Sequence, residues 1–433
     1  MSPGKHPQPT PLILILAILT LTALRVSAAS PTSVRAVQTP SGWELRVNGQ
    51  PYYIRGIACN EALGDKGEDL LALAAQAGAN TVRVYGDVTD DYLNRAQTHG
   101  LKVNVGFWFN AIRLGSQESY RDPKHCAELK QKALDYVRRF KDHPAVLLWT
   151  MGNEVFSFTD NEQEKEAFGH FLEDLVKAIH REDPNHPVLY ASSYTRCLSD
   201  LKRWVPDIDV IGVNVTGGAG AATHWGERNG FDRPVVVSEF GPLGSWEQRK
   251  DVNGMPYDAF DQFKAENYIS SWRQIQSNPR SCVGGFAFVM GGLRNQDSLT
   301  WYNMNYGNLR REGYWAIYEL YTGKKPSNRP PKITSMIVNP VSDVKPGTQV
   351  NVQVEASDVD GNLLSYDYFV TNIAKDPLIV EKPTFYPAQP EILKPGAARV
   401  RMPEQAGVYR VYAFVTDGHD NVAIADRSVR ITP

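Results

Sequence analysis

The sequence predicts a closed (β/α)8 barrel followed by a small all-β sandwich. Two observations indicate the barrel. Between residues 40 and 322, eight apolar runs alternate with helical patterns, and most of these runs are continuously apolar, as in strands buried on both faces. A third observation indicates the sandwich, because after residue 332 the helical period stops and short β-forming runs alternate with turn residues. An open doubly wound sheet is less favoured, since no G-x-G-x-x-G loop follows the first strand.

The predicted barrel strands are short and are separated by amphipathic helices. Asn48 and Gly49 predict a hairpin turn that leads into the first strand. Apolar residues recur every three or four positions in segments such as 126–140 and 168–179, which indicates helices packed on the barrel. The eight strands are predicted at Tyr52 to Ile57, Thr81 to Tyr85, Lys102 to Trp108, Ala145 to Met151, Pro187 to Ala191, Val210 to Val215, Pro234 to Phe240 and Val283 to Met290.

Composition and charge exclude several classes of protein. The chain has 433 residues, of which 42% are hydrophobic and 22% charged, as in ordinary globular proteins. The 46 Lys and Arg nearly balance the 48 Asp and Glu, so we expect no nucleic-acid partner. The nine histidines form no H-E-x-x-H or comparable cluster, so we expect no metal ion and no organic cofactor.

The N-terminal residues 1–28 have the features of a signal peptide. Lys5 precedes an uncharged apolar run, Leu12 to Leu24, and Val26-Ser27-Ala28 offers a small-residue cleavage site. This run is short for a membrane span, although an uncleaved anchor is the alternative. We therefore expect a secreted protein, periplasmic or extracellular, with no stable membrane insertion.

Export makes disulfide bonds possible but does not select them. Four cysteines are present, Cys59, Cys126, Cys197 and Cys282, and their wide spacing excludes a zinc-ribbon pattern. Four cysteines allow three pairings, among which the sequence does not choose, and buried free thiols are an equal alternative.

The sequence divides into four parts. The signal peptide is followed by the predicted barrel domain at residues 40–322. A Pro- and Lys-containing stretch, residues 323–332, is typical of a stiff, solvated linker. Residues 333–433 form the predicted sandwich, whose role we expect to be that of a spacer because it contains no Trp. Oligomeric state is not indicated by any feature of the sequence.

Two glutamates directly follow predicted barrel strands. Glu154 comes after the fourth strand in Trp149-Thr150-Met151-Gly152-Asn153-Glu154, and Glu239 ends the seventh in Val235-Val236-Val237-Ser238-Glu239. Barrels of this kind carry their chemistry at the carboxyl ends of the strands. Because strands four and seven face each other across the ring, the two carboxyl groups are expected to approach one point from opposite sides.

Three segments resemble glycoside hydrolase family 2, a TIM-barrel family, and its wider clan A. Residues 143–154 (HPAVLLWTMGNE) resemble the acid/base segment, residues 233–241 (RPVVVSEFG) resemble the nucleophile segment, and residues 47–57 resemble the lead-in to the first strand. The resemblance covers roughly residues 40 to 320. It implies a retaining glycosidase, in which two carboxyls stand about 5–5.5 Å apart.

The resemblance also implies roles for individual residues. Glu154 would be the general acid/base and Glu239 the nucleophile. Asn153 would hydrogen-bond the 2-hydroxyl of the sugar. Arg83, at the end of the second strand, would keep the nucleophile ionised and oriented, and Tyr85 beside it is a weaker candidate for substrate binding.

Aromatic residues after the strands are candidates for stacking on sugar rings. Clan members often carry a Tyr or His after strand six, where this chain has Asn214, also a substrate-binding candidate. Strand eight often ends in Trp in this clan, whereas here it ends in residues 289–292. We therefore expect Trp301 or Tyr302 to form the floor of the sugar-binding site. The Asn214-Val215-Thr216 sequon was discounted as a glycosylation site. The tryptophan candidates are Trp108, Trp225, Trp246 and Trp301.

The sequence therefore predicts a secreted retaining β-glycosidase that acts on an oligo- or polysaccharide. Residues 80–85 and 100–106 are similar to β-1,3-glucanases and glucanosyltransferases, which favours β-glucan as substrate. A transglycosylase with the same residues is the first alternative, and a catalytically silent carbohydrate-binding barrel is the second. The pieces 356–362 and 415–418 resemble polycystic-kidney-disease and cadherin-like repeats, which implies an immunoglobulin-like sandwich. Family 2 enzymes usually carry sandwiches before the barrel, and their absence here favours an open cleft.

Overall fold

The structure, a computed structural model, describes residue 1 and residues 32–193, 198–291, 298–373 and 383–433. Apart from residue 1, the predicted signal peptide lies outside the described residues, as does Cys197. Within the described ranges, no helix is both long enough and apolar enough to cross a membrane.

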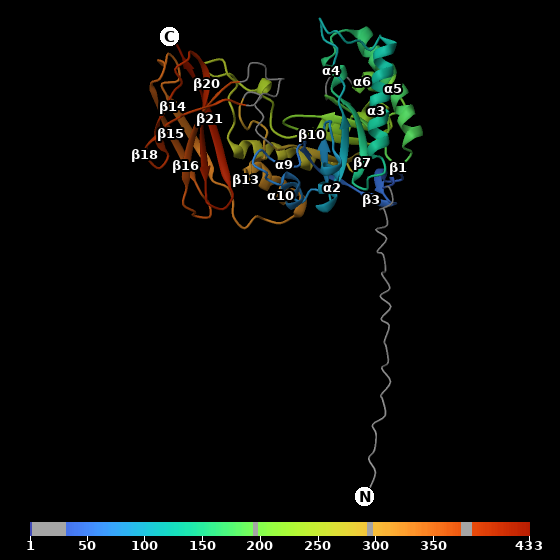
Figure 1. Cartoon of the computed structure of the whole chain (residues 1–433), viewed down its shortest axis with the longest axis horizontal. Coiled ribbons are helices and arrows are strands. Elements are labelled where there is room, and N and C mark those ends of the chain that lie inside the picture. The colour runs from blue at the N-terminus through green and yellow to red at the C-terminus, as the bar shows by residue number, and fades with distance from the viewer. Residues whose placement is uncertain (2–31, 194–197, 292–297, 374–382) are drawn as a thin grey trace.

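Eight parallel strands close into a barrel in the order β10-β11-β4-β5-β6-β7-β8-β9, which confirms the predicted (β/α)8 class (Figure 1). Most of their residues are fully buried, because the interior face packs on the other strands and the outer face on the helices. The strands are β4 (Ile54–Cys59), β5 (Thr81–Val84), β6 (Lys102–Phe107), β7 (Val146–Asn153), β8 (Val188–Ser193), β9 (Val210–Asn214), β10 (Val235–Phe240) and β11 (Cys282–Met290).

Helices surround the barrel. The two longest, α3 and α5, begin at Asp122 and Asn161, whose side chains cap the first backbone N–H groups. In Figure 1, α3, α5 and α6 lie on the side of the barrel away from the sandwich. The helices are α1 (Leu70–Gln76), α2 (Asp90–Thr98), α3 (Pro123–Phe140), α4 (Val155–Phe158), α5 (Glu162–Glu182), α6 (Leu198–Trp204), α7 (Gly220–Thr223), α8 (Trp225–Arg228), α9 (Asp261–Ser277) and α10 (Glu312–Thr322), with the 3-10 turn η1 (Ser245–Glu247).

A small antiparallel sheet covers the amino ends of the barrel strands. It consists of β1 (Val34–Thr39), β2 (Gly42–Val47) and β3 (Gln50–Tyr52), joined by the predicted Asn48-Gly49 turn. Val34 and Leu45 of this sheet pack in one cluster with residues near the starts of the barrel strands, such as Leu147. The barrel is thereby closed at this end, which leaves the carboxyl ends of the strands for chemistry. β1 lies before residue 40, where the barrel domain was predicted to begin.

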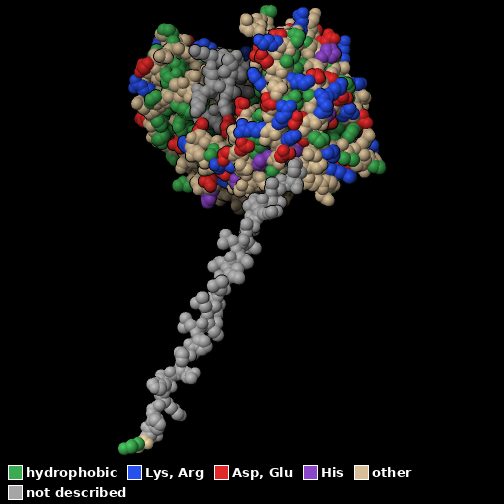
Figure 2. All heavy atoms as spheres, turned by 45° about the vertical axis from the view of Figure 1, so that its right-hand side comes forward, with side chains coloured by type: hydrophobic (Ala, Val, Ile, Leu, Met, Phe, Trp, Pro, Cys, Tyr) green, Lys and Arg blue, Asp and Glu red, His purple; other side chains and the backbone are tan. Residues whose placement is uncertain are grey.

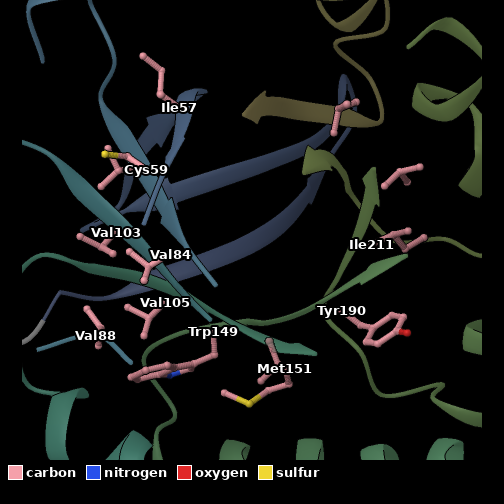
Figure 3. Packing of buried hydrophobic residues seen from close by; sticks show 14 of the residues in the cluster. Ile57, Cys59, Val84, Val88, Val103, Val105, Trp149, Met151, Tyr190 and Ile211 are labelled. Carbon is pink, nitrogen blue, oxygen red and sulfur yellow. The ribbon is translucent and has the colours of Figure 1, made fainter. Parts of the chain in front are cut away.

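The main core lies between the barrel strands and the helices. Figure 3 shows Val84, Val103 and Val105 beside Trp149 and Met151, all of them buried. The Trp149 indole, which has no exposed surface, donates to the Asp183 carboxylate at 2.8 Å, so its one polar atom is satisfied. This packing fixes the end of β7, from which the chain continues to Glu154.

The C-terminal region is a sandwich of two four-stranded antiparallel sheets, which confirms the all-β prediction. Alternate residues of β15 are buried, and the inner faces of both sheets share one apolar core. One sheet contains β14 (Lys332–Asn339), β15 (Gln349–Ser357), β19 (Ala397–Arg401) and β18 (Glu391–Lys394), and the other contains β17 (Phe385–Tyr386), β16 (Ser365–Asn372), β20 (Gly407–Thr416) and β21 (Val422–Ile431). The immunoglobulin type of this sandwich stays a prediction.

The sandwich packs directly on the loops that follow β10 and β11. The Leu299 N–H donates to the Tyr412 hydroxyl at 2.6 Å, and Arg410, paired with Asp426, donates to the Pro256 carbonyl at 2.8 Å. These groups are buried. The hairpin of β12 (Asn305–Tyr306) and β13 (Leu309–Arg310) also contacts the sandwich, through Tyr306 and Phe414.

The predicted solvated linker is held at Arg329. Its backbone N–H donates to Asp360 of the sandwich at 2.7 Å, and its guanidinium pairs with Glu312 and Glu319 of α10. Buried contacts also join the sandwich to the barrel, whereas the spacer role expected for it stays a prediction.

Candidate active site

The two glutamates lie at the carboxyl ends of β7 and β10. Glu239 is the fifth residue of β10, and Glu154 directly follows β7. Glu154 adopts a left-handed backbone conformation, with φ of 57°, where it precedes the short helix α4. Its backbone N–H donates to the Ala191 carbonyl of β8 at 2.8 Å, which holds this unusual conformation in place.

Arg83 connects both carboxylate-bearing strands. The side chain comes from β5 and is completely buried. One guanidinium nitrogen, Nη1, donates to Oε1 of Glu239 at 2.9 Å and to the Ser238 carbonyl at 2.7 Å, while Nη2 donates to Oδ1 of Asn153 at 2.8 Å. Arg83 therefore pairs with Glu239 and at the same time orients the side chain that precedes Glu154.

Tyr85 is a second donor to Glu239. Its hydroxyl reaches Oε1 at 2.8 Å, and the Arg83 guanidinium lies over its ring, 4.3 Å from the centroid. The resemblance implies a Tyr or His after strand six, where Asn214 stands. In the structure, the residue after strand two, Tyr85, supplies a phenol partner to the carboxylate.

Asn214, at the end of β9, bridges to the other glutamate. Its Nδ2 donates to Oε1 of Glu154 at 2.9 Å and to Oδ1 of Asn153 at 3.0 Å. Its Oδ1 accepts from the Ser238 hydroxyl at 2.7 Å, which fixes the orientation of the amide. The side chain is buried and fully engaged, consistent with our discounting of Asn214 as a glycosylation acceptor.

The two carboxyls differ in their electrostatic surroundings. Burial, followed by the nearby charge of Glu239, raises the pKa of Glu154 to about 7. Burial also raises the pKa of Glu239, but Arg83 and Tyr85 act in the opposite direction by pairing with its charged form. The site thus contains one carboxyl that can remain protonated near neutral pH, and another that carries a cation and a phenol as partners.

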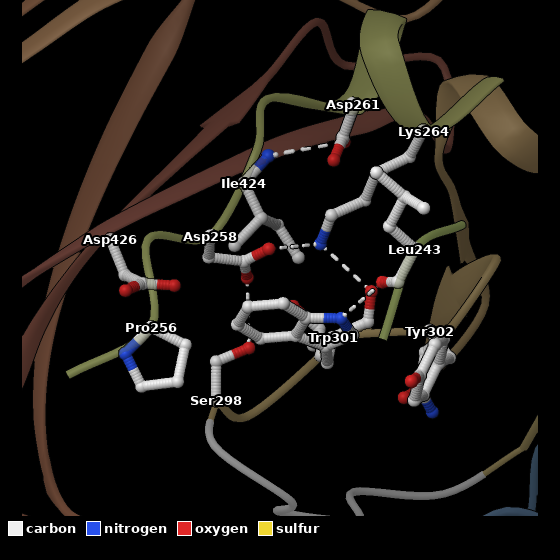
Figure 4. Close-up of polar contacts among 12 residues, drawn as sticks. Leu243, Pro256, Asp258, Asp261, Lys264, Ser298, Trp301, Tyr302, Ile424 and Asp426 are labelled. Atoms are coloured by element: carbon white, nitrogen blue, oxygen red, sulfur yellow. Dashed lines mark hydrogen bonds and ion pairs between the residues drawn. The ribbon is translucent and has the colours of Figure 1, made fainter. Parts of the chain in front are cut away.

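The four tryptophan candidates fall into two groups. Trp108 and Trp246 are 52% and 69% exposed, whereas Trp301 is 2% exposed and Trp225 packs partly against the barrel core. The Trp301 indole donates to the Leu243 carbonyl at 3.0 Å, and Lys264 donates to the Trp301 carbonyl at 2.8 Å (Figure 4). The prediction that Trp301 stacks on sugar is therefore wrong for this structure, because its ring is covered. Tyr302, the alternative for the floor, is buried as well.

Phe288 is a site residue that the sequence analysis missed. It lies in β11, is partly exposed, and its ring centroid stands 6.4 Å from that of Tyr85 and 5.2 Å from that of Tyr302. The resemblance implies a Trp at the end of strand eight. Phe288 directly precedes the residues 289–292 that end this strand, so an aromatic residue in the last part of the apolar run was the signal for it.

Other reactive groups lie outside this network. In the described ranges, no three His, Cys, Asp or Glu side chains are grouped so as to hold a metal ion. Cys59, Cys126 and Cys282 are free thiols. Lys, Arg, Asp and Glu side chains are interspersed on the face shown in Figure 2.

Comparison with known proteins now gives the family of the barrel. Residues 91–275, which run from α2 to α9 and include both glutamates, match the model of "Glycosyl hydrolases family 2, TIM barrel domain". This part of the chain is similar to family 2 glycosyl hydrolase barrels. The match confirms the resemblance from which the sequence analysis argued.

Curated relatives of this chain include a β-glucuronidase and a β-galactosidase. The β-glucuronidase of Sus scrofa is 25% identical over 326 residues, which cover 66% of this chain and 47% of the relative. The β-galactosidase of Leuconostoc mesenteroides is 22% identical over 48% of this chain and 20% of its own length. The chain thus spans less than half the length of these relatives.

Solved structures support the fold of the barrel. A β-glucuronidase from Bacteroides uniformis superposes with a TM-score of 0.52 at 15% identity, covering 93% of this chain and 48% of that protein. The β-D-glucuronidase of Dictyoglomus thermophilum gives 0.51 at 18% identity, covering 68% of this chain and 54% of its own. At these identities, the likeness concerns the fold alone.

Proposed function

We propose that the protein is a retaining β-glycosidase with Glu239 as nucleophile and Glu154 as general acid/base. The observation that carries the proposal is the hydrogen-bonded network from Glu239 through Arg83, Asn153 and Asn214 to Glu154. The Glu239 carboxylate pairs with the Arg83 cation, whereas the Glu154 carboxyl accepts from the Asn214 amide. Such a division suits a nucleophile and a proton donor.

In the first step, an oxygen of Glu239 attacks the anomeric carbon and the glycosidic C–O bond breaks. Glu154 transfers its proton to the leaving oxygen, and a glycosyl ester forms on Glu239. Arg83 and Tyr85 orient the attacking carboxylate. Because the Glu154 pKa is about 7, the acid retains its proton near neutral pH.

In the second step, the Glu154 carboxylate accepts a proton from an incoming water molecule. The water oxygen attacks the anomeric carbon, the ester bond breaks, and Glu239 leaves as a carboxylate. A sugar hydroxyl in place of water gives transglycosylation with the same residues. Both glutamates are present and held by defined partners, which disfavours a catalytically silent barrel.

Substitution of each glutamate tests the assignment of roles. Glu239→Ala should abolish turnover of every substrate, whereas Glu154→Ala should retain the first step for aryl glycosides with good leaving groups, which need little protonation. Burst kinetics with a dinitrophenyl glycoside would measure that step. Equal loss in both variants would contradict the assignment.

The sugar is a separate question, because the relatives are β-glucuronidases and a β-galactosidase while short segments favour β-glucan. We propose a β-linked glycan as substrate. Product analysis by chromatography and mass spectrometry with β-glucans, mannans, galactans and β-glucuronides would name it. Shorter products establish hydrolysis, longer products establish transglycosylation, and intact glycans across the panel would contradict the proposal.

We further propose that the protein is exported, on the basis of residues 1–28. Mass determination of the mature protein from the culture medium or periplasm of the producing cells should give an N-terminus close to residue 29. Retention of the full-length chain inside the cell would contradict export.

A further inference from the structure

Large apolar side chains are exposed mainly at one end of the barrel. In the described barrel region, apart from Phe263 at the start of α9, they lie on loops that follow strands β4, β6, β7 and β10. These loops all leave the carboxyl ends of the strands, where Glu154 and Glu239 lie. Apolar surface gathered in one place is typical of a binding face. The exposed residues are Leu63, Trp108, Leu114, Phe158, Leu243, Trp246 and Val252.

Trp108 and Trp246 stand on opposite sides of this face. Trp108 follows β6 and Trp246 lies in the loop after β10, and in the closed strand order β6 and β10 are four places apart in either direction. The two loops therefore leave opposite strands of the barrel. A ligand that touched both indoles would extend across the mouth of the barrel.

Each indole lies beside a glycine. A Cβ atom at Gly86, the residue after Tyr85, would be 3.7 Å from Cβ of Trp108. A Cβ atom at Gly244 would come within 2.4 Å of the Trp246 ring, so that ring lies against the chain there. Trp108 is thus close to the residue that follows Tyr85, and both indoles leave half or more of their surface in solvent.

The loop that carries Trp246 is held in place. The Trp301 indole donates to the Leu243 carbonyl at 3.0 Å, the Gly244 N–H donates to the Glu247 carboxylate at 2.7 Å, and the Gly217 N–H donates to the Gly241 carbonyl at 3.1 Å. An exposed indole on a fixed loop is a preorganised surface, since little conformational freedom is lost when a ring binds to it.

We propose, on the basis of the glycosidase function above, that the protein takes an extended β-linked glycan across the barrel mouth. Trp108 binds a sugar ring on one side of the bond that is cleaved, and Trp246 binds a ring on the other side. The flat apolar face of an indole matches the C–H face of a pyranose ring. The substrate class is therefore an oligo- or polysaccharide that is cut internally, rather than a glycoside with a single sugar.

Chain-length dependence tests the proposal. The probes are nitrophenyl β-glycosides with one sugar, and gluco-, manno- and galacto-oligosaccharides from disaccharide to hexasaccharide. We expect kcat/KM to rise with length in the series that is cleaved. Trp108→Ala and Trp246→Ala should each lower kcat/KM for the hexasaccharide about 10-fold, and that for the nitrophenyl glycoside by much less. Phe263→Ala, which alters a similarly exposed aromatic residue at the start of α9, outside this face, should change neither.

Phenylalanine variants separate ring loss from a folding defect. Trp108→Phe and Trp246→Phe retain an aromatic face and should recover most of the hexasaccharide activity, with circular dichroism unchanged in all variants. A kcat/KM that does not rise with chain length, or an equal loss on both substrates, would overturn the extended-substrate proposal but not the glycosidase function. Absence of turnover of every probe by the wild-type protein would instead overturn the glycosidase function.

Discussion

At the residue scale, the Asn214 amide selects the oxygen of Glu154 that carries the proton. Nδ2 donates to Oε1, and the amide cannot be reversed without losing the Ser238 hydroxyl as a donor to Oδ1. An oxygen that already accepts an N–H is a poor position for a further proton. The proton of neutral Glu154 therefore belongs on Oε2, and the acid is oriented as well as protonated.

The same contact leads to a prediction about pH. The Asn214 hydrogen bond lowers the pKa of Glu154 toward about 7, against the raising effects of burial and Glu239. Asn214→Ala should therefore raise this pKa, and the alkaline limb of kcat/KM should move from about pH 7 to higher pH. Asn351→Ala, at an exposed position in the sandwich, is the control. An alkaline limb that stays in place or moves to lower pH would contradict this account of the Glu154 pKa.

Glu154 should also reduce stability in alkaline solution. Its folded-state pKa of about 7 lies above the ordinary value of 4.5, so its contribution to stability is full below about pH 4.5 and is lost as pH rises through 7. Glu154→Gln removes the titration and keeps the oxygen that faces Asn214. We expect this variant to be more stable than the wild type by up to about 3 kcal/mol at pH 8, with no gain at pH 4. Urea unfolding at both pH values measures this, and an equal difference at the two would be inconsistent with it.

The positions of these polar site residues could be predicted because each lies at the end of an apolar run. Glu154, Glu239, Arg83 and Asn153 each lie at or beside the carboxyl end of an apolar run, where the chain must leave the barrel. The residues that contact these side chains are harder to predict from the sequence. Tyr85 donates across the barrel to Glu239, and Phe288 lies within an apolar run. Contacts between strands that are distant in sequence leave no local pattern.

At the element scale, the loops after β10 and β11 support each other through Trp301. The sequence marked this residue as a sugar platform because it follows strand eight, and nothing local distinguishes an exposed indole from a covered one. In the structure, Lys264 and Asp258, 2.5 Å apart, lie beside it, and its N–H reaches Leu243 (Figure 4). Trp301 is therefore a positioning residue for the loop that carries Trp246.

A Trp301→Phe substitution tests this positioning role. The variant retains a buried ring but loses the donor to the Leu243 carbonyl, so the loop with Trp246 should become less fixed. We expect KM for the hexasaccharide to rise several-fold, with kcat/KM for the nitrophenyl glycoside unchanged. An equal effect on both substrates would indicate a general loss of structure instead.

The eight strands were predicted within a few residues because continuous apolar runs are a strong local signal. β1 was missed, since its residues are mostly half-buried and polar residues interrupt it. The short helices α7 and α8 were missed for another reason: four residues are too few to show a helical period. The sandwich class was predicted from short β-forming runs separated by turn residues. Its contact with the barrel was not predicted, because an interface between distant segments leaves no periodic pattern in the sequence.

At the scale of the whole molecule, the barrel and the sandwich share buried polar contacts. Tyr412 accepts from Leu299, and Arg410, paired with Asp426, donates to the Pro256 carbonyl. A third contact joins the Trp315 indole of α10 to Asn421 at 2.7 Å. Separating the two parts would expose these groups and the apolar cluster that contains Leu299 and Phe414.

We therefore expect the two parts to unfold together. Calorimetry should show one cooperative unfolding transition for the barrel and the sandwich together. Tyr412→Phe, which leaves the buried Leu299 N–H without its acceptor, should lower the stability of that single transition by about 1–3 kcal/mol. A second, separate transition that alone responds to Tyr412→Phe would show that the sandwich is energetically independent.

The contact between Arg410 and the Pro256 carbonyl limits how such a protein can be rearranged over evolutionary time. Accessory modules are exchanged freely between chains when only a tether joins them to their neighbour. Here a replacement module would have to bring an arginine to the loop after β10 and a hydroxyl to Leu299. The barrel and this sandwich are therefore expected to be inherited as a pair, with changes on one side of the contact matched by changes on the other.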